Sequence, residues 1–369
     1  MKLIVIKSNL KDGLDVVSRA AGENTPLPIL KNVLVEAQDG KINLTATNLE
    51  VALNYVVSGK IIEPGQVTVP AAVFLNIISN LPSERLTIEA KNNSTEIKTD
   101  NYQAVLQGMP AEEFPLVPKI KNQKEFLEIK GDILKEALAQ TAPSAQTNDL
   151  RPELNAVLLA YSGDEIILAA TDSFRLAEKK LAASQYKTEV KDPFRALVPL
   201  KTAAELARII RDEDLVKIYR DANQILFAAD RFRLTSRVLE GNFPDYAAIL
   251  PQAFDTEIYL DRQELINALK LAGVFSSKVS EIKIRTSENN KSIEVFSHDQ
   301  SGENNYLLPA RVQGKPREIS FNWRFLLDGL RALKTEDIFW GINEENKPAL
   351  LRSPQDGSYF YVLMPILRA

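Results

Sequence analysis

The stretch Ala169-Ala170-Thr171-Asp172-Ser173-Phe174-Arg175-Leu176, near the middle of the chain, is a short apolar strand that runs into a polar turn. An aromatic, a basic and an apolar residue follow that turn. Because successive side chains of a strand alternate between its two sides, Phe174 and Leu176 should lie together, with Arg175 opposite them. Alone, a polar turn between strands is ordinary content of a β-rich domain. The stretch becomes informative because two similar strand-and-turn segments occur elsewhere in the chain.

Three segments of the chain open alike, each with a period-two stretch followed by an amphipathic helical pattern. The helical patterns begin Leu10-Lys11-Asp12-Gly13-Leu14, Leu134-Lys135-Glu136-Ala137-Leu138 and Leu265-Ile266-Asn267-Ala268-Leu269, which lie 124 and 131 residues apart. A strand that ends in a turn like the one above follows at 44–49 and again at 295–299. Self-similarity at a fixed period is the signature of a repeat architecture.

Each third then enters a second helix, expected at 71–81, 200–211 and 322–334, and closes with two alternating segments. In the first two thirds the closing segment ends in Phe-Pro, at 114–115 and 243–244. Units of this size are large enough to own a core each. We therefore expect an α+β fold made of three tandem copies of one domain, at 1–122, 123–252 and 253–369.

The composition narrows the classes of protein and of site. Hydrophobic residues make up 45% of the chain and charged residues 25%, which is ordinary globular composition. The absence of Cys rules out disulfides and thiolate metal sites, and a single His, His298, disfavours a His-based metal site or catalytic triad. The sequence has no nucleotide-binding glycine loop and no nucleophile elbow. We expect a non-catalytic protein without a metal or a cofactor.

Charge and hydropathy bear on the location and on the partners. The apolar runs are shorter than the roughly 18 residues of a membrane span, and residues 1–7 alternate like a strand without a signal-peptide pattern. We therefore expect a cytoplasmic protein that makes no contact with membranes. The net charge of −4 lacks the basic surplus of most non-specific nucleic-acid binders. If the protein handles DNA, it does so with local charge or with topology.

Repeated domains with exposed sheet edges can continue one sheet from domain to domain, and such a series ends in protected edges or closes on itself. Closure as a two-fold dimer would bury the last two edges. The candidate dimer edges are the strand that holds Ala104 and Leu106, and the strand and helix around Val274 and Phe275.

Several strings in the chain carry a family resemblance. Besides the triple repeat, they are Ala-Thr-Asp-x-x-Arg-Leu-Ala at 170–177, Glu-Gly-x-Phe-Pro-Asp-Tyr at 240–246 and Tyr-Val-Leu-Met-Pro at 361–365, with Leu-Pro-Ile-Leu at 27–30. They resemble the bacterial DNA polymerase III β subunit family, the sliding clamps. The resemblance implies a head-to-tail homodimer of three-domain protomers, a six-domain ring with helices inside and sheets outside. It also implies that duplex DNA passes through the ring.

The same resemblance implies the partners and the DNA-facing residues. The partners would be the DNA polymerase III catalytic subunit, the clamp-loader complex, and other polymerases and repair proteins that carry clamp-binding peptides. Helices that line a pore around DNA should be basic, although Lys and Arg decorate any solvated helix face. The candidates for facing DNA are Lys11, Arg19, Lys135, Asn148, Arg151, Lys201, Arg208, Lys270 and Arg331.

In the family, partner peptides bind a pocket between the second and third domains, where apolar side chains suit a short peptide anchored by Leu or Phe. An alternative for Val362, Leu363 and Ile366 is that they form the last core strand. The residues implied for the pocket are Leu154, Thr171, Ser173, Phe174, Arg175, Leu176, Pro244, Ile249, Phe325, Val362, Leu363, Met364, Pro365, Ile366, Leu367 and Arg368.

The chain departs from the best-known members of the family at several of these places. Ser173-Phe174 replaces a Gly-His pair, and Ala247-Ala248 stands where those members have an Arg, so the peptide preference should be more apolar. Asn24 and Pro152-Glu153 replace residues that contact DNA in some members. The first and third copies of the turn lack the aromatic-Arg-Leu run, which predicts one pocket per protomer. The competing hypothesis is a three-repeat interaction scaffold that does not bind DNA.

Overall fold

The computed structural model describes residues 1–22, 25–148 and 151–367. The chain divides into two compact units, and the division falls within the second of the three predicted repeats. Unit 1 comprises Met1–Ile133, Tyr186–Lys191 and Glu205–Val238, and unit 2 comprises Leu134–Gln185, Asp192–Ala204 and Leu239–Ala369. In the part of the chain that is described, each unit holds two antiparallel sheets.

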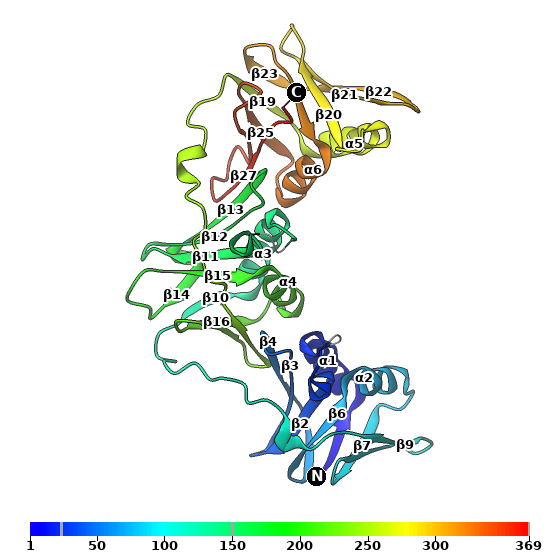
Figure 1. Cartoon of the computed structure of the whole chain (residues 1–369). Coiled ribbons are helices and arrows are strands. Elements are labelled where there is room, and N and C mark those ends of the chain that lie inside the picture. The colour runs from blue at the N-terminus through cyan, green and yellow to red at the C-terminus, as the bar shows by residue number, and fades with distance from the viewer. Residues whose placement is uncertain (23–24, 149–150, 368–369) are drawn as a thin grey trace. The chain divides into compact units, whose positions relative to one another are not determined.

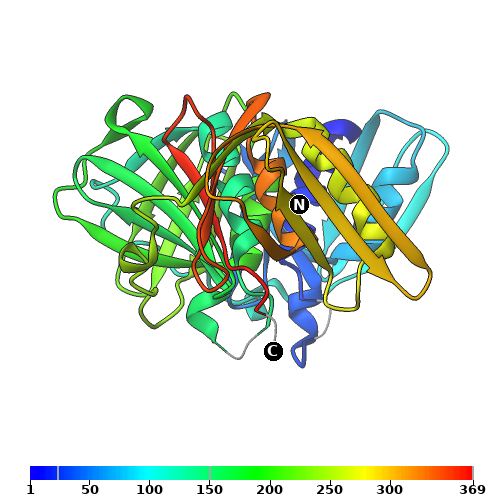
Figure 2. The ribbon, with the colours of Figure 1, turned by 90° about the horizontal axis from the view of Figure 1, so that it is seen from above.

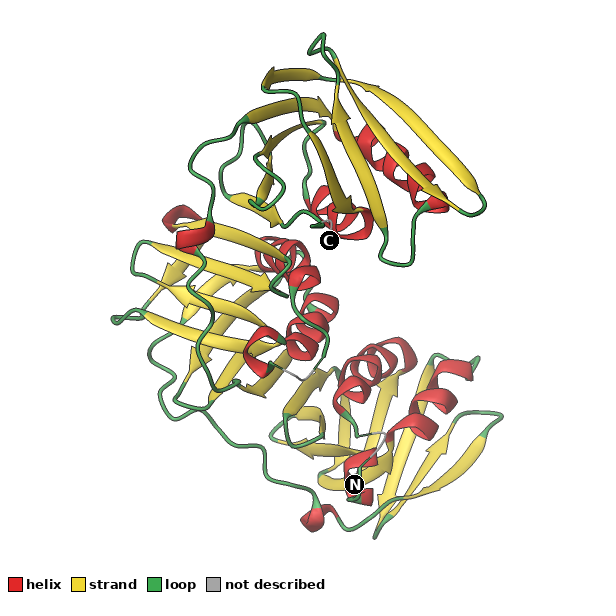
Figure 3. Cartoon of the chain, turned by 45° about the horizontal axis from the view of Figure 1, so that its top comes forward, coloured by secondary structure: helices red, strands yellow, loops and turns green. Residues whose placement is uncertain are grey.

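Unit 1 holds a five-stranded and a nine-stranded sheet (Figure 1). In spatial order the smaller sheet is β5 (Gly59–Glu63), β1 (Lys2–Ile6), β7 (Arg85–Lys91), β8 (Ser94–Lys98) and β9 (Gln103–Gln107). The larger is β14 (Tyr186–Thr188), β10 (Leu127–Lys130), β16 (Leu215–Arg220), β17 (Gln224–Ala228), β18 (Phe232–Arg237), β4 (Val51–Val57), β3 (Lys41–Thr47), β2 (Asn32–Gln38) and β6 (Gly65–Pro70). Helices α1 (Lys7–Val17) and α2 (Ala71–Asn80) pack together, and α1 lies against β3 and β4 (Figure 3).

Unit 2 holds a nine-stranded and a four-stranded sheet. The larger is β15 (Phe194–Pro199), β11 (Ala156–Tyr161), β12 (Glu165–Thr171), β13 (Arg175–Ala182), β27 (Tyr359–Leu363), β26 (Ala349–Arg352), β25 (Asp337–Ile342), β19 (Thr256–Asp261) and β23 (Arg311–Gly314). The smaller is β22 (Gly302–Pro309), β21 (Ser292–Asp299), β20 (Glu281–Thr286) and β24 (Glu318–Asn322). Helix α5 (Arg262–Ala272) packs against β21 and β22 (Figure 2), and α6 (Trp323–Ala332) against β24 and β27.

One order of elements occurs three times along the described chain: a strand, a helix, five strands, a second helix and three strands. In the middle copy the helices are α3 (Gly131–Thr141) and α4 (Leu200–Ile209). The helices follow their strands directly, and side-chain oxygens of Asp261 and Asn322 cap α5 and α6 by accepting from backbone N–H groups. The expected α+β fold of three tandem copies is confirmed. The three predicted domain bounds stay a prediction.

Two strand pairs join successive copies, and we call them junctions. At the first junction β18 of the second copy pairs with β4 of the first, with Thr235 opposite Ala52. At the second junction β27 of the third copy pairs with β13 of the second, with Val362 opposite Leu176. The last strand of one copy thus extends the sheet of the copy before it. Because backbone hydrogen bonds run across both junctions, each nine-stranded sheet is shared by two copies.

The segment that follows β18 covers one face of the sheet at the second junction. Phe243, Tyr246, Leu250 and Phe254 pack there against a cluster that contains Leu176. The hydroxyl of Tyr246 donates a hydrogen bond to the carboxylate of Glu178, which is 4% exposed. Burial raises the pKa of Glu178 above its ordinary value of 4.5, although Tyr246 and Lys180 favour the ionised form.

This raised pKa predicts a pH-dependent effect of Glu178→Gln. The folded state holds its proton more tightly than the unfolded state, so ionisation of Glu178 opposes folding once the pH exceeds 4.5. We expect the variant and the native chain to have similar urea midpoints below that pH. The variant should gain a relative advantage as the pH rises above 4.5, and should hold it once Glu178 is ionised in the folded native chain. A difference in midpoint that does not change with pH would contradict this account.

Candidate functional site

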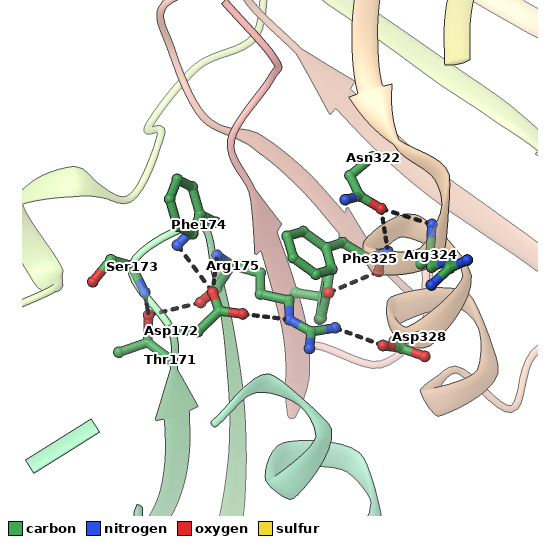
Figure 4. A network of polar contacts seen from close by, with 10 residues as sticks. Thr171, Asp172, Ser173, Phe174, Arg175, Asn322, Arg324, Phe325 and Asp328 are labelled. Atoms are coloured by element: carbon green, nitrogen blue, oxygen red, sulfur yellow. Dashed lines mark hydrogen bonds and ion pairs between the residues drawn. The ribbon is translucent and has the colours of Figure 1, made fainter. Parts of the chain in front are cut away.

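The turn between β12 and β13 is fixed by its own side chains (Figure 4). The hydroxyl of Thr171 accepts from the Ser173 N–H at 3.1 Å and donates to the Arg175 carbonyl at 2.7 Å. One carboxylate oxygen of Asp172 accepts from the N–H groups of Phe174 and Arg175, both at 3.0 Å. Ser173 has a φ of 77°, in the left-handed region that favours glycine. The turn therefore holds Phe174 in a defined place at the end of the sheet.

The guanidinium of Arg175 links this turn to α6 (Figure 4). Its Nε donates to Asp172 at 2.9 Å and its Nη1 to Asp328 at 2.6 Å. It also lies over the ring of Phe325, 4.2 Å from the ring centroid. The side chains of Arg175 and Asp172 are only 11% and 13% exposed, so this ion pair is shielded from solvent, whereas the Asp328 side chain is 34% exposed. Arg175 therefore positions the turn and the start of α6 relative to each other.

The end of the chain joins the same site. Across the second junction Arg175 pairs with Leu363. Beyond β27, the Met364 N–H donates to the carbonyl of Phe174 at 2.8 Å, and the Ile366 N–H donates to that of Ser320 at 2.8 Å. The C-terminal segment is thus held between the turn and β24.

The residues implied for the pocket divide by exposure. Phe174, Ile249 and Leu367 are 62%, 54% and 63% exposed, so their apolar side chains are available to a partner. Val362 packs with Leu176 in one cluster, and Leu363 in the cluster on the other face of the sheet. The side chains of Val362 and Leu363 thus lie in the core, as in the alternative that assigned them to the last core strand. Of the rest, Leu154, Thr171, Leu176 and Pro365 are buried, Arg175, Pro244, Phe325, Met364 and Ile366 are half-buried, Ser173 is exposed, and Arg368 lies outside the described residues.

The residues expected to face DNA lie on the helices or close to them. In unit 1, Glu205 pairs with Arg19 at 3.5 Å and with Arg208 at 2.8 Å. Helix α2 has no basic residue. Lys11 lies on α1, and in unit 2 Lys135 lies on α3, Asn148 and Arg151 between α3 and β11, Lys201 on α4, Lys270 on α5 and Arg331 on α6.

One pair of the residues expected at the dimer edges lies on an edge strand, and the other pair lies beside an edge strand. Ala104 and Leu106 lie on β9, which is the edge strand of the five-stranded sheet. Val274 and Phe275 lie in a short 3-10 helix, Gly273–Phe275, which directly follows α5. The sheet edge next to them is β22, against which that helix packs. Sequence reasoning missed β22, although the third copy of the turn, at 297–299, leads straight into it.

Three family models cover almost the whole chain. The N-terminal domain of the DNA polymerase III beta subunit matches residues 1–118, the central domain 128–245 and the C-terminal domain 247–367. The beta sliding clamp of Synechococcus elongatus is 31% identical over 377 residues, with 99% of each chain covered. The chain belongs to the DNA polymerase III beta subunit family.

Solved structures of this family share the fold. The DNA polymerase sliding clamp from Bacillus subtilis is 26% identical with a TM-score of 0.93, and each chain is covered in full, at 100%. The DNA polymerase III subunit beta from Pseudomonas aeruginosa is 29% identical with a TM-score of 0.92 and the same coverage. The sequence resemblance is thereby confirmed.

No three or more His, Asp or Glu side chains in residues 1–22, 25–148 and 151–367 are grouped so that they could hold a metal ion. In the same residues, every helix is too short or too polar to cross a membrane.

Proposed function

We propose that the chain is a processivity factor that closes as a dimeric ring around duplex DNA and tethers the replicative polymerase to its template. The observation that carries this proposal is the pair of sheet edges left at the two ends of the repeat. Within the described chain, β9 of the first copy and β22 of the third lack the neighbour that their counterparts have at the junctions. A second copy of the chain, placed head to tail, would supply it.

The two junctions predict the register of this third strand pair. In each copy a turn begins at Asn48, Asp172 or Asp299, and the strand after it is β4, β13 or β22. The closing strands β18 and β9 both follow a tight turn, whose last residue is Phe232 or Tyr102. Ala52 faces Thr235 and Leu176 faces Val362 at equivalent places. The same register places Glu303 of one chain opposite Val105 of the other chain in the dimer.

Exposed apolar side chains support the pairing of these edges. Val105 on β9 is 54% exposed and Leu307 on β22 is 66% exposed. Val274, which we expect beside the same interface, is 67% exposed. Their burial in a dimer would be favourable by about 25 cal/mol per Å² of apolar area. An edge strand with unpaired backbone groups and exposed apolar side chains tends to pair with another chain, and natural proteins usually avoid leaving such an edge exposed.

The pocket and the basic residues complete the proposal. Partner peptides from the DNA polymerase III catalytic subunit, the clamp-loader complex, other polymerases and repair proteins would bind beside Phe174, Leu367 and Ile249. The basic helix residues would contact phosphates weakly and without sequence preference. Retention on DNA would then be topological, which agrees with a net charge of −4. We expect this accessory subunit to catalyse no reaction itself and to work in the cytoplasm.

The test is retention on circular DNA. We expect a dimer that, once loaded onto a nicked circular plasmid by the clamp loader of the same organism, co-elutes with the plasmid in gel filtration. Cutting the plasmid at one site should release the dimer within minutes, because the ring slides off the free ends of the DNA. Lys201→Glu should reduce loading but leave the dependence on closed DNA intact. A monomer that elutes alike with circular and cut plasmid would instead favour a scaffold that does not encircle DNA.

A further inference from the structure

Unit 1 contains a cavity of about 720 Å³ beneath the first linker, residues 111–123. This linker follows the face of the nine-stranded sheet away from α1 and α2 (Figures 1 and 3). The floor is formed by both strands of the first junction, with Ala52 and Asn54 from β4 and Thr235 from β18. Val117 of the linker is part of the roof. The volume is in the range of ordinary ligand sites.

The same place at the second junction is filled by the chain itself. There the second linker lays Phe243, Tyr246 and Leu250 on the equivalent face of the sheet. The rings of Phe243 and Tyr246 meet edge to face, with their centroids 5.9 Å apart. The Tyr246 hydroxyl binds the carboxylate of Glu178 on β13. A phenol ring with a polar partner below it is thus the natural occupant of this position in the repeat.

Residue differences between the two junctions contribute to the space. Counted from the Phe-Pro pair of each linker, Val117 stands where the second linker has Tyr246. On the strands, Asn54 faces Thr45 as Glu178 faces Ala169, so Asn54 takes the place of Glu178. The first junction has therefore lost the phenol ring but keeps a polar side chain where the hydroxyl would bind.

We propose that this cavity binds a tyrosine side chain from a peptide segment of a partner protein. The ring would lie where Tyr246 lies at the second junction, and the side-chain carbonyl of Asn54 would accept from its hydroxyl. The amide of Asn54 already donates to Thr45 at 2.9 Å, which turns the carbonyl away from that neighbour. This site is separate from the peptide pocket beside Phe174 and does not depend on the proposed function.

Leu116 favours a peptide over a free small molecule as the source of the ring. It is a lining residue of the cavity, adjoins Val117 in the linker, and is 96% exposed. Such exposure of a leucine provides an apolar contact just outside the ring site. Arg233 and Gln123, which bond each other at 3.4 Å, provide polar groups at the same cavity. An extended peptide with an apolar residue next to its tyrosine would use both features.

The test is titration of the full chain, with methyl-labelled Leu and Val, by the dipeptides acetyl-Leu-Tyr-amide and acetyl-Tyr-Leu-amide. We expect saturable shifts of the Leu116 and Val117 methyl signals with at least one of them. Affinity should be several-fold weaker for the Phe analogue, which lacks the hydroxyl, and for p-cresol, which lacks the peptide. No saturable shift would overturn the proposal. Equal affinity for p-cresol would overturn the assignment to a peptide.

Two variants separate occupancy of the cavity from a change in fold. Val117→Tyr supplies the missing ring from the linker, and should abolish dipeptide binding while the melting temperature stays equal or rises. Val117→Ala enlarges the roof without filling the cavity, and should retain binding within about threefold. Dipeptide binding that persists in Val117→Tyr would overturn the proposal. So would binding that is lost equally in both variants while both remain folded.

Discussion

Val105→Glu is expected to dissociate the dimer. The predicted register places this residue opposite Glu303 of the other chain in the dimer. The substitution therefore sets two carboxylates against each other and removes an apolar contact. Like charges directly opposite on paired strands cost about 1 kcal/mol. A head-to-tail dimer has two such interfaces, so we expect a total of about 2 kcal/mol, which is about a 30-fold rise in the dissociation constant. Sedimentation velocity over a dilution series measures it.

A second substitution tests the register itself. Glu303→Lys, added to Val105→Glu, should restore the dimer because it places opposite charges face to face. The matched control is Glu288→Lys in the same background, which makes the same change of charge in the turn between β20 and β21, away from the β22 edge, and should restore far less. The register is wrong if both lysines rescue equally. The proposed interface is wrong if Val105→Glu leaves the dimer unchanged.

Phe174→Ala is expected to abolish most of the affinity for partner peptides. Exposed aromatic side chains at the centre of a binding surface commonly contribute 2 kcal/mol or more, so we expect a loss of about 30-fold. The probe is a synthetic peptide from the tail of the polymerase catalytic subunit of the same organism, followed by fluorescence anisotropy. Because Phe174 is 62% exposed, the melting temperature should not change.

Leu215→Ala provides the matched control, since Leu215 is 53% exposed on β16 of unit 1 and lies outside the proposed pocket. A deletion of residues 367–369 should also weaken the peptide. A longer deletion from Met364 is a poorer test, because Met364 and Ile366 hold the chain end by backbone hydrogen bonds. Unchanged peptide affinity in Phe174→Ala would mean that partners bind elsewhere.

The repeat and the fold could be predicted from the sequence because they depend on local signals. Alternating strands, helix starts and the Phe-Pro pairs recur at one spacing, and each reports on a few neighbouring residues. The turn at Thr171-Asp172 could also be predicted from the sequence, since Thr and Asp side chains that hydrogen-bond the nearby backbone are typical of turns.

The contacts of the site could not be predicted in the same way. Asp328 approaches Arg175 only because β27 pairs with β13, with Leu363 opposite Arg175 and 188 residues further along the chain, and because α6 packs against β27. Nothing in the pattern of α6 sets Asp328 apart from any other solvated carboxylate. The cavity beneath the first linker likewise depends on side-chain volumes at the junction. The hydrophobic periodicity of a sequence carries no information on these volumes.

The two junctions have a consequence for dilution. Within one chain, the partners of β4 and β13 are tethered, so each junction forms at an effective concentration that is set by the linker and does not vary with the amount of protein. The β9–β22 contact proposed between copies has no such tether. If the ring forms as proposed, lowering the protein concentration favours separate chains. The association of two chains is then the one step of assembly that depends on protein abundance, since the second β9–β22 contact closes within the dimer.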